Sequence, residues 1–586
     1  MTSRAYSVEA VRSAERPLIE AAAAAGDPDA VMRRAAAGLA HHTAALLRER
    51  TGGLYGRSVL LLVGSGDNGG DALYAGAMLR QRGCRVDAVL LDPARAHARG
   101  LAALRRAGGR AVDAGAGLGS AAGRASEARI APNPLPGMGI RYPSRGSGSA
   151  GGVADFGRGM PDVAVDGIVG LGGSGPLREP AGQIVTALAE AGVPWVAVDL
   201  PSGVDADTGT VHTPHVPATL TVTFGMLRRA HLLASPACGR VEVVDIGLTE
   251  PDVGPDAGRD AEPRAGLRAE QSAAPGVILR PSLAEVGRAW PVPGPADDKY
   301  SQGVVAIRAG SEKYPGAAVL SVSAAVAATS GMVRYVGSGA DRVLAARPEV
   351  VCHPSVAEAG TAQAWVVGPG AGTGPEGIAD IDAVLAHGRP TLLDADALTC
   401  IAAHPVLLRS ATAPVLLTPH GGEFDRLTGG WDRADRAGAL RRYVAGLRER
   451  GIEATVLLKG RVTLIDDGQV TYAVDAGSSW AATAGSGDVL AGVAGALIAH
   501  AATGSSTSQA GTSSSQADQS RSPAGPSPSL AWPAAAAAIL HGHAAHRAAY
   551  RAAHSRDLGP GGPGAPIGAS DLLAALPGAI ADLRAR

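Results

Sequence analysis

Ser58-Val-Leu-Leu-Leu-Val63 leads directly into Gly64-Ser-Gly-Asp-Asn-Gly-Gly-Asp71, and an apolar helical stretch follows. A short, fully apolar run of this kind is typical of a buried parallel strand, and the glycines allow a tight turn from that strand into a helix. The same order of strand, loop and helix recurs through both halves of the chain. The sequence therefore predicts an α/β fold with parallel-type sheets.

Further apolar runs that end in Gly, Asp or Pro mark the other strands of the first half. We expect them at 86–91, 163–168, 195–200 and 219–224, after a helical stretch at 6–50. The first domain is taken as 1–248, with a flexible insertion rich in Gly, Ser, Ala and Pro at 115–160. Residues 249–280 show little periodicity and are expected to form a linker.

A second α/β series is expected to occupy 281–586. Its predicted strands, which alternate with Ala-rich helices in a parallel-type sheet, are 303–307, 364–367, 391–393, 415–417, 455–458 and 462–465. Residues 503–529 are almost entirely Ser, Gly, Gln, Thr, Ala and Pro. Because such a segment buries too little apolar surface to order itself, we expect a disordered insertion there.

Composition limits the class of protein. The 586 residues suit two domains, and 46% hydrophobic with 18% charged residues indicates a globular chain. Lys and Arg total 53 against 54 for Asp and Glu, so no basic field favours nucleic acid or a membrane surface. The cysteines are isolated, and no uninterrupted apolar run reaches the roughly 18 residues of a membrane span. We expect a soluble, cytoplasmic protein, compatible with a homo-oligomer, that binds small molecules.

Lysine is rare, with Lys299, Lys313 and Lys459 as its three occurrences. Where nearly every basic residue is Arg, a retained Lys marks a candidate position at which a compact ammonium does what a planar guanidinium cannot. Chance survival is the alternative.

The first glycine-rich loop carries unexpected charges for a dehydrogenase. Gly64, Gly66 and Gly69 satisfy the GxGxxG pattern of nicotinamide-binding folds. However, Asp67 and Asp71 lie where a pyrophosphate would need amide donors and a positive helix end. The carboxylates indicate a cation or a hydroxylated ligand, and an ordinary glycine turn with solvated acids is the alternative.

Two later strand ends carry matching polar residues. Asp166 begins Asp-Gly-Ile-Val-Gly-Leu-Gly-Gly-Ser-Gly-Pro, and Asp199 begins Asp-Leu-Pro-Ser-Gly-Val-Asp. Ligands of open α/β sheets collect outside the carboxyl ends of strands, so these segments can converge on the first loop. Asn68, Asp166 and Ser202 would then offer only oxygen atoms, which suit a hard cation.

Taken together, GSGDNGGDAL, VDGIVGLGGSGPLREP, VAVDLPSGVDADTG and TVTFG resemble the NAD(P)H-hydrate epimerase domain, across essentially residues 6–248. The resemblance implies a Rossmann-like three-layer domain, with potassium held by Asn68, Asp166 and Ser202. It also implies contacts with the hydrated dinucleotides NADHX and NADPHX. The residues concerned are Asp67, Asn68, Gly69, Gly70, Asp71, Gly170, Leu171, Gly172, Gly173, Ser174, Gly175, Pro176 and Asp199.

This chain departs from the epimerase pattern at two places. The family usually has Asn where Asp67 stands, and a Lys near the position of Arg228 and Arg229. Asp67 adds negative charge beside the expected cation. Epimerisation at a ring carbon bearing a hydroxyl requires loss and return of that bond, assisted by an acid/base group. Our hypothesis assigns that catalytic role to Asp199.

A second glycine-rich turn lies near the C-terminus. Thr483-Ala-Gly-Ser-Gly-Asp-Val-Leu-Ala-Gly492 places small residues before an acid at the start of a helix. Backbone amides of such a turn can surround a transferring phosphoryl group while Asp488 accepts the proton of the attacked hydroxyl. A simple glycine-rich helix start is the alternative. Three further motifs at predicted strand ends favour the phosphoryl site, and they begin at Lys459, Thr418 and Gly368. By itself, His420 is more often a satisfied loop histidine than a ligand contact.

The second half is similar to the ribokinase-like superfamily, and within it to the NAD(P)H-hydrate dehydratase family. The carrying segments are DKYSQGVVAIRAGSEKYPGAAVL, VVGPGAG, LLDADAL, LLTPHGGEFDRLTG, VLLKGRVT, ATAGSGDVLAG and ILHG, over about 290–575. The resemblance implies that Ala318, Gly370, His420 and the catalytic Asp488 contact the hydrate. It implies that Lys459, Gly460, Arg461, Val462, Thr463 and Gly487 contact the nucleotide.

The activity implied for the whole chain is repair of hydrated nicotinamide dinucleotides. The first domain would interconvert the R and S hydrates. The second would use ADP or ATP with magnesium to phosphorylate and dehydrate the S form, and with ADP it would release AMP and phosphate. The bacterial-type layout favours ADP. The alternatives are a vitamin or sugar kinase fused to a Rossmann-type oxidoreductase, and a non-catalytic nucleotide sensor.

Overall fold

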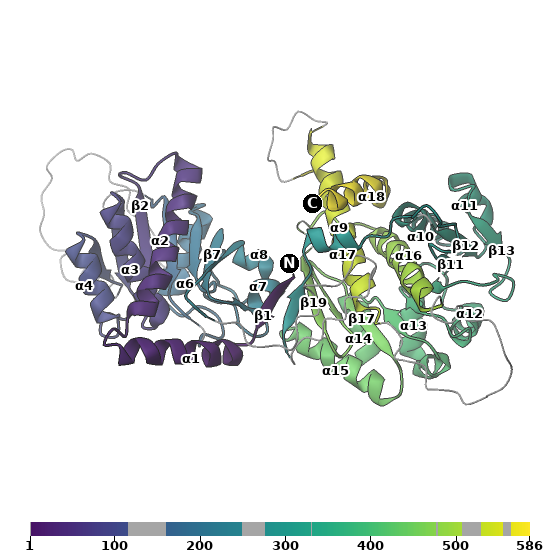
Figure 1. The fold of residues 1–586 in the computed structure, drawn as a ribbon, viewed down its shortest axis with the longest axis horizontal. Coiled ribbons are helices and arrows are strands. Elements are labelled where there is room, and N and C mark those ends of the chain that lie inside the picture. Colours follow the sequence, from purple (N-terminus) through teal and green to yellow (C-terminus); the bar gives the residue numbers. More distant parts are fainter. Residues whose placement is uncertain are drawn as a thin grey trace, which may run out of the picture. The chain divides into compact units, whose positions relative to one another are not determined.

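The computed structural model describes residues 2–114, 160–170, 172–248, 276–329, 331–475, 477, 479–506, 529–554 and 564–586. The chain divides into two compact units, one of Ala5–Asp252 and one of Met1–Arg4 with Val253–Arg586 (Figure 1). Nearly all of the expected insertions at 115–160 and 503–529, most of the linker at 249–280, and Leu171 lie outside the described residues.

The N-terminal unit contains a parallel sheet in the order β4-β3-β2-β5-β6-β7-β9. Its strands are β2 (Ser58–Val63), β3 (Arg85–Leu90), β4 (Arg110–Asp113), β5 (Val163–Gly167), β6 (Trp195–Val198), β7 (Leu220–Phe224) and β9 (Arg240–Val244), with β8 (Leu227–Arg228) pairing Ala5 and Tyr6 of β1 (Ser3–Tyr6). Its helices are α1 (Val8–Ala24), α2 (Ala30–Thr51), α3 (Asp67–Gln81), α4 (Ala98–Arg106), α6 (Ala181–Glu190), α7 (Arg229–Leu233) and α8 (Ser235–Cys238).

Strand β2 shows why this unit has three layers. Val59, Leu61 and Val63 pack in one core cluster with residues of α2 and α3. Leu60 and Leu62 belong to a second cluster with residues of α6. Successive side chains of a strand point to opposite faces, so a strand that is apolar throughout needs a helical layer on each side. The three-layer expectation is confirmed.

The stretch predicted as helical at 6–50 consists of two helices. Gly26, with φ of 79°, follows the end of α1, and Pro28 precedes α2. A left-handed glycine ends a helix readily, and a proline restricts the residue before it to extended backbone. The apolar periodicity continues on both sides of residues 25–29, so the sequence pattern did not indicate where α1 ends and α2 begins.

The C-terminal unit contains a sheet whose strands follow the order β13-β12-β11-β14-β15-β16-β17-β18-β19-β10. The strands are β10 (Ile278–Arg280), β11 (Val304–Arg308), β12 (Met332–Val336), β13 (Val351–His353), β14 (Ala364–Val367), β15 (Thr391–Leu393), β16 (Val415–Leu417), β17 (Ala454–Leu458), β18 (Val462–Asp466) and β19 (Thr471–Asp475). The helices are α9 (Leu283–Ala289), α10 (Pro315–Ala328), α11 (Ala340–Ala346), α12 (Pro375–Ala386), α13 (Asp396–Ala403), η1 (Pro405–Ser410), α14 (Gly421–Thr428), α15 (Arg436–Glu449), α16 (Ser486–Ser506), α17 (Ala531–His554) and α18 (Ala569–Arg584).

The parallel-type prediction for this sheet is wrong at one edge. Strands β17, β18 and β19 pair antiparallel, whereas β11 to β17 are parallel. Only a few residues connect β17 to β18, and a parallel return needs a crossover of a dozen or more. Two further differences are small: β10 lies inside the expected linker, and α16 continues to Ser506, into the segment expected to be disordered.

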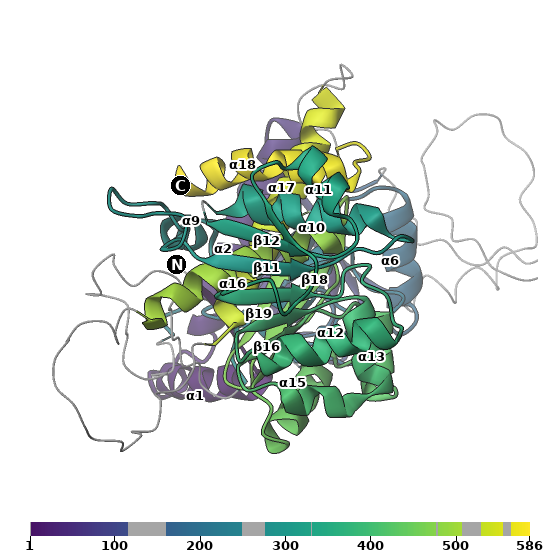
Figure 2. The same ribbon diagram turned by 90° about the vertical axis from the view of Figure 1, so that its right-hand side faces the viewer.

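Helices cover both faces of the C-terminal sheet, as Figure 2 shows. Helices α10, α16, α17 and α18 contact one another on one face, while α12, α13 and α15 lie on the other. Helix α16 is the one helix of the described residues long and apolar enough to cross a membrane, over Ser486–Thr503, and 67% of that window is buried. Its contacts with α10, α17 and β14 account for an apolar composition on every side.

Candidate active sites

A cavity of about 600 Å³ in the C-terminal unit lies at the carboxyl ends of β15, β16 and β17. Of the residues predicted from sequence, it brings together His420, Lys459, Gly460, Arg461, Thr463, Gly487 and Asp488. Val462, Ala318 and Gly370 are not among its lining residues. Val462 and Thr463 are neighbours in β18, where successive side chains point to opposite faces, so Val462 faces away from the cavity that Thr463 lines.

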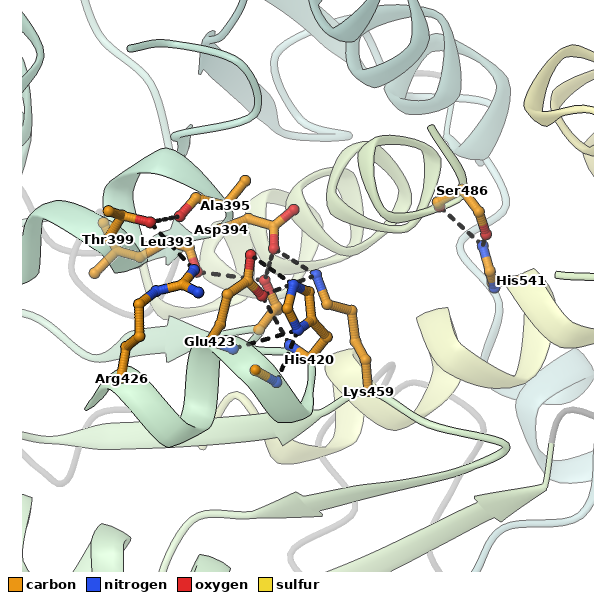
Figure 3. Close-up of polar contacts among 12 residues, drawn as sticks. Leu393, Asp394, Ala395, Thr399, His420, Glu423, Arg426, Lys459, Ser486 and His541 are labelled. Atoms are coloured by element: carbon orange, nitrogen blue, oxygen red, sulfur yellow. Dashed lines mark hydrogen bonds and ion pairs between the residues drawn. The ribbon is translucent and has the colours of Figure 1, made fainter. Parts of the chain in front are cut away.

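Lys459 is the cationic centre of this cavity. Its Nζ lies 2.8 Å from Asp394 Oδ1 and 3.8 Å from Glu423 Oε2 (Figure 3). These carboxylates raise the pKa of Lys459 against the opposing effect of burial, which is the largest single influence. The ammonium is therefore charged and held where a phosphate can approach it.

Asp394 follows β15 and is 2% exposed. Its Oδ1 also accepts a hydrogen bond from Thr418 Oγ1 at 2.8 Å. The next residue, Ala395, has φ of 50°, a left-handed conformation that costs a residue with a Cβ about 1 kcal/mol or more. Strained backbone of this kind persists where surrounding contacts fix it, which is common at functional sites.

The predicted turn leads into α16 as expected. Gly485 has φ of 82°, and Ser486 begins the helix, so backbone N–H groups and the positive helix end face the cavity. Burial, with repulsion from Asp394, raises the pKa of Asp488 to about 6. A carboxylate with a pKa near neutrality is suited to general-base work. A Cβ built on Gly487 would lie 3.5 Å from Lys459 Nζ, so the glycine leaves the space in front of the ammonium open.

His541 of α17 holds the turn from behind. Its Nε2 lies 2.9 Å from Ser486 Oγ and 3.0 Å from the Ser486 carbonyl oxygen (Figure 3). Burial lowers the pKa of His541 to about 4, so the ring is neutral at pH 7 and brings no second cation into the cavity.

His420 is both a cavity residue and a helix cap. Its Nδ1 accepts hydrogen bonds from Gly422 N and Glu423 N at the start of α14, while its own backbone N–H donates to Glu423 Oε2 at 2.8 Å. This reciprocal cap fixes the side chain and leaves Nε2 as the protonated nitrogen. His420 is therefore a satisfied loop histidine at Nδ1, as the alternative interpretation expected, and it also lines the cavity.

Ala318 and Gly370 lie together at the start of α10. A Cβ on Gly370, whose φ is 59°, would meet Tyr314 and Ala317, and one on Gly310 would meet Ala318. These small residues allow the β11 and β14 loops to approach α10 closely. Their assignment to the hydrate remains a prediction from resemblance.

In the N-terminal unit, the predicted cation ligands Asn68, Asp166 and Ser202 are all buried. Ser202 donates to both carboxylate oxygens of Asp166, from Oγ and from N at 2.7 Å each. Asn68 Nδ2 donates to the carbonyl oxygens of Val169 and Val198, at 3.1 and 2.6 Å. Burial raises the pKa of Asp166 to about 6. A buried carboxylate among hydroxyl, amide and carbonyl oxygens is a donor set that fits potassium.

The predicted substrate loop borders a cavity of about 380 Å³ in the same unit. Gly170, Gly172, Gly173, Ser174, Gly175, Pro176 and Ser202 line it. A Cβ on Gly170 would come within 2.8 Å of Asn68 Oδ1, so this glycine is required for loop and helix to meet. The residues of the first loop, Asp67 to Asp71, form the first turn of α3 but are not among the lining residues.

Asp199 sits at the end of β6 with φ of 64° and is 2% exposed. Its Oδ1 accepts a hydrogen bond from Thr223 Oγ1 at 2.8 Å and lies 3.1 Å from Arg228 Nη2. Arg228 also lies 3.2 Å from Glu15 Oε1. A strained, buried carboxylate with a dedicated cation is consistent with a functional role.

Several residues of these sites were not predicted individually. Asp394, Glu423, Ser486 and His541 belong to segments that carry the resemblance, but none was assigned a role from sequence. Glu15 and Arg228 depend on α1 and β8 meeting, which no local pattern reveals. Among the described residues, no group of three or more His, Cys, Asp or Glu side chains could hold a metal ion.

Comparison with known proteins agrees with this geometry. Residues 28–230 match the family described as YjeF-related protein N-terminus, and residues 305–558 match the family described as NAD(P)H-hydrate dehydratase. The bifunctional NAD(P)H-hydrate repair enzyme Nnr of Mycobacterium tuberculosis is 45% identical, over 84% of this chain and 89% of that protein. The enzyme of the same name from Corynebacterium glutamicum is 34% identical, over 84% of this chain and 87% of that protein.

A solved structure of the ADP/ATP-dependent NAD(P)H-hydrate dehydratase of Bacillus subtilis, co-crystallised with ATP and Mg²⁺, is 20% identical, with a TM-score of 0.39 over 52% of this chain and 97% of that one. The two family matches and the coverage of the full-length relatives lead to one conclusion. The chain belongs to the family of bifunctional NAD(P)H-hydrate repair enzymes.

Proposed function

We propose that this chain restores hydrated nicotinamide dinucleotides in two steps, each performed by one unit. The N-terminal unit interconverts the R and S hydrates, and the C-terminal unit removes water from the S hydrate at the expense of a nucleotide. The observation that carries the proposal is the C-terminal cavity, which Lys459, Gly487 and Asp488 line together at the start of the long helix α16.

In the C-terminal step, the Asp488 carboxylate takes the proton of the hydrate hydroxyl while that oxygen attacks the terminal phosphorus of the nucleotide. Lys459 and the N–H groups of the Gly485–Asp488 turn stabilise the negative charge that develops on the phosphoryl oxygens. The phosphorylated hydroxyl then leaves as phosphate with its bonding electrons. Loss of the neighbouring ring proton completes the double bond of the dihydronicotinamide.

ADP is the proposed donor, and AMP and phosphate are the other products. Magnesium bound to the nucleotide would neutralise charge on its phosphates. Asp394 and Glu423 supply carboxylate oxygens of the type Mg²⁺ prefers. Mg²⁺ is usually held by one or two carboxylates together with substrate phosphates.

In the N-terminal step, Asp199 acts as an acid/base group beside the hydroxylated ring carbon. Asn68, Asp166 and Ser202 would hold potassium, which supplies a fixed positive charge for the dinucleotide's phosphates. Residues 67–71, 170, 172–176 and the undescribed Leu171 would contact the dinucleotide. We further propose that the enzyme works in the cytoplasm and needs no nucleic acid or membrane.

The test uses the purified chain with a mixture of R and S NADH hydrates and ADP, with restored NADH followed by absorbance. Complete conversion is expected. Conversion that stops when the S form is exhausted would refute the epimerase half, and no conversion with ADP or ATP would refute the dehydratase half. Repeating the assay with NADPH hydrates and with potassium replaced by sodium tests the substrate range and the proposed cation.

A further inference from the structure

The proposed function gives Asp71, a buried carboxyl group of α3, a contact with the dinucleotide but no part in the proton transfers. Asp71 is 6% exposed, and its Oδ1 has no hydrogen-bond partner within the part of the chain that the structure describes. Leaving a buried polar atom unpaired costs about 1–3 kcal/mol, so such atoms in folded proteins call for an explanation. A bound ligand that supplies the missing partner is one.

The position of Asp71 on α3 directs it toward the proposed epimerase centre. Asn68 lies one turn earlier on the same helix face, and its side chain bonds the carbonyl of Val198, the residue before Asp199. Asp199 is also the charge that most affects Asp71. The first turn of α3, which carries Asp71, therefore lies against the carboxyl end of β6, which Asp199 follows, and both carboxyl groups are buried there.

Asp71 and Asp199 have contrasting surroundings. Asp199 accepts a hydrogen bond from Thr223 Oγ1 and lies 3.1 Å from the guanidinium of Arg228. Asp71 forms no ion pair with a cation among the residues that the structure describes, and burial, with repulsion from Asp199, Asp67 and Glu15, holds its pKa well above the ordinary value. Of these two buried carboxyl groups, Asp199 has a cation and a hydroxyl as partners, whereas Oδ1 of Asp71 has none, and such a contrast in surroundings is typical of an acid/base pair.

We propose that Asp71 is the proton donor of the epimerase reaction, with Asp199 as its basic partner. This inference rests on the epimerase half of the proposed function. Asp71 gives its proton to the hydroxyl oxygen of the hydrate as the bond from ring carbon to oxygen breaks. The bonding electrons leave with the oxygen as water, and the lone pair of the ring nitrogen stabilises the resulting cation. Water then adds to the opposite face and passes one proton to Asp199.

The product is the other epimer, with Asp71 ionised and Asp199 protonated. Transfer of one proton from Asp199 to Asp71 through solvent restores the starting state, so no other reactant is consumed. The carboxylates of Glu15 and Asp67 add negative charge near the cationic ring, which favours its formation.

The groups that face Asp71 define the pH dependence. They are the acids Asp67, Asp199 and Glu15, with Arg228 bound to the last two. From the neighbouring helices, His97 packs against Gly70, and Asp29 bonds Tyr74. No cation in this set pairs with Asp71, and burial holds its pKa well above the ordinary value. Epimerisation should therefore slow at the pH where Asp71 ionises.

The experiment compares the full chain with its Asp71→Asn and Asp71→Glu variants. R hydrate and ADP are supplied to report epimerisation, and S hydrate with ADP reports dehydration in the same preparation. Asp71→Asn keeps the shape but cannot donate a proton, so epimerisation should fall about 10²- to 10⁴-fold and lose its upper pH limb. Dehydration of S hydrate should be unchanged. Asp71→Glu should retain the limb and part of the rate.

Asp162→Asn is the matched control, because Asp162 precedes β5 at the opposite end of the strand and bonds Ser58 N and Oγ. It should epimerise like the wild type. Wild-type epimerisation rates in Asp71→Asn, with the upper limb intact, would overturn the inference. So would equal losses in Asp71→Asn and a folded Asp71→Glu, which would indicate packing alone. Failure of the wild-type chain to epimerise would instead refute the proposed function.

Discussion

Lys459 Nζ lies 2.8 Å from Asp394 Oδ1, although 65 residues separate the two in the chain. The parallel pairing of β15, β16 and β17 brings them together, because both follow the carboxyl ends of their strands. Asp394 is almost fully buried, so Lys459 has two roles. It compensates the Asp394 charge, and in the proposed mechanism it also offers its ammonium to the nucleotide.

Replacing Lys459 with Met should affect both roles. Breaking a buried pair leaves an uncompensated charge, and with Lys459 only 20% exposed we expect a loss of about 3 kcal/mol in the free energy of unfolding. Dehydration of S hydrate should fall about 10²- to 10³-fold, since one stabiliser of the phosphoryl charge is gone. Urea unfolding and the NADH assay measure these effects. Dehydration at the wild-type rate would contradict the role of Lys459, and epimerisation by the same protein is the control.

Asp488→Asn should reduce dehydration about 10²- to 10⁴-fold while epimerisation continues. In the wild type, Asp488 acts as a base only when ionised. Its pKa of about 6 therefore predicts that the dehydration rate falls as pH drops below about 6 and is constant above it. This fall can be checked by measuring the single-turnover rate of dehydration as a function of pH.

Asp396 provides a matched control for that profile. It bonds Gly372 N outside the cavity lining, and its charge helps raise the pKa of Asp488. Asp396→Asn should keep the activity at pH 8 and move the acid limb to lower pH. If the acid limb of the dehydration rate stays at the same pH, a group other than Asp488 causes it.

His541→Leu should remove the hydrogen bonds to Ser486 and loosen the turn of Gly485–Asp488. We expect dehydration to fall about tenfold, the size of one lost hydrogen bond, and His541→Asn to recover part of the loss.

The pH dependence of the free energy of unfolding should also change in His541→Leu. The folded-state pKa of about 4 lies below the ordinary 6.5, so unfolding takes up a proton between these values. The neutral histidine's contribution is complete above about pH 6.5 and is lost as pH falls toward 4. Thermal unfolding between pH 4 and 7 should show a smaller pH slope in the leucine variant.

Gly170→Ala should disturb the proposed cation site without touching the C-terminal unit. The added Cβ would lie 2.8 Å from Asn68 Oδ1, so Asn68 must move. Epimerisation should require a higher potassium concentration, and potassium titration of the R-hydrate assay measures it. Gly53→Ala, whose Cβ meets no atom within 4 Å, is the control. An unchanged potassium requirement in Gly170→Ala would exclude Asn68 as a ligand.

The sequence predicted the elements whose signal is local. The apolar runs of β2, β14, β15 and β16 match the structure to the residue because a buried strand is apolar from end to end. Strand β12 was not predicted, since Arg334 interrupts its apolar run and finds its partners, Ala359 O and His353, only in the folded sheet.

The same limit applies to the sites. Asp488 and Lys459 stand in motifs whose chemistry can be read locally, and the structure places both at one cavity. The part played by Asp394 depends on which strand neighbours β15, and that of His541 depends on α17 reaching α16. Such roles arise from pairings distant in sequence, and a single chain without related sequences carries no local signal for them.

Because Asp394, His420 and Lys459 come from the ends of three adjacent strands, no fragment holding only one of those strands can assemble the proposed dehydratase centre. During refolding, helices such as α16 can form early from local contacts, but the cavity must wait for β15, β16 and β17 to align. The time at which NADH production returns therefore reports when the C-terminal sheet is complete. It should be later than the time at which helix content returns.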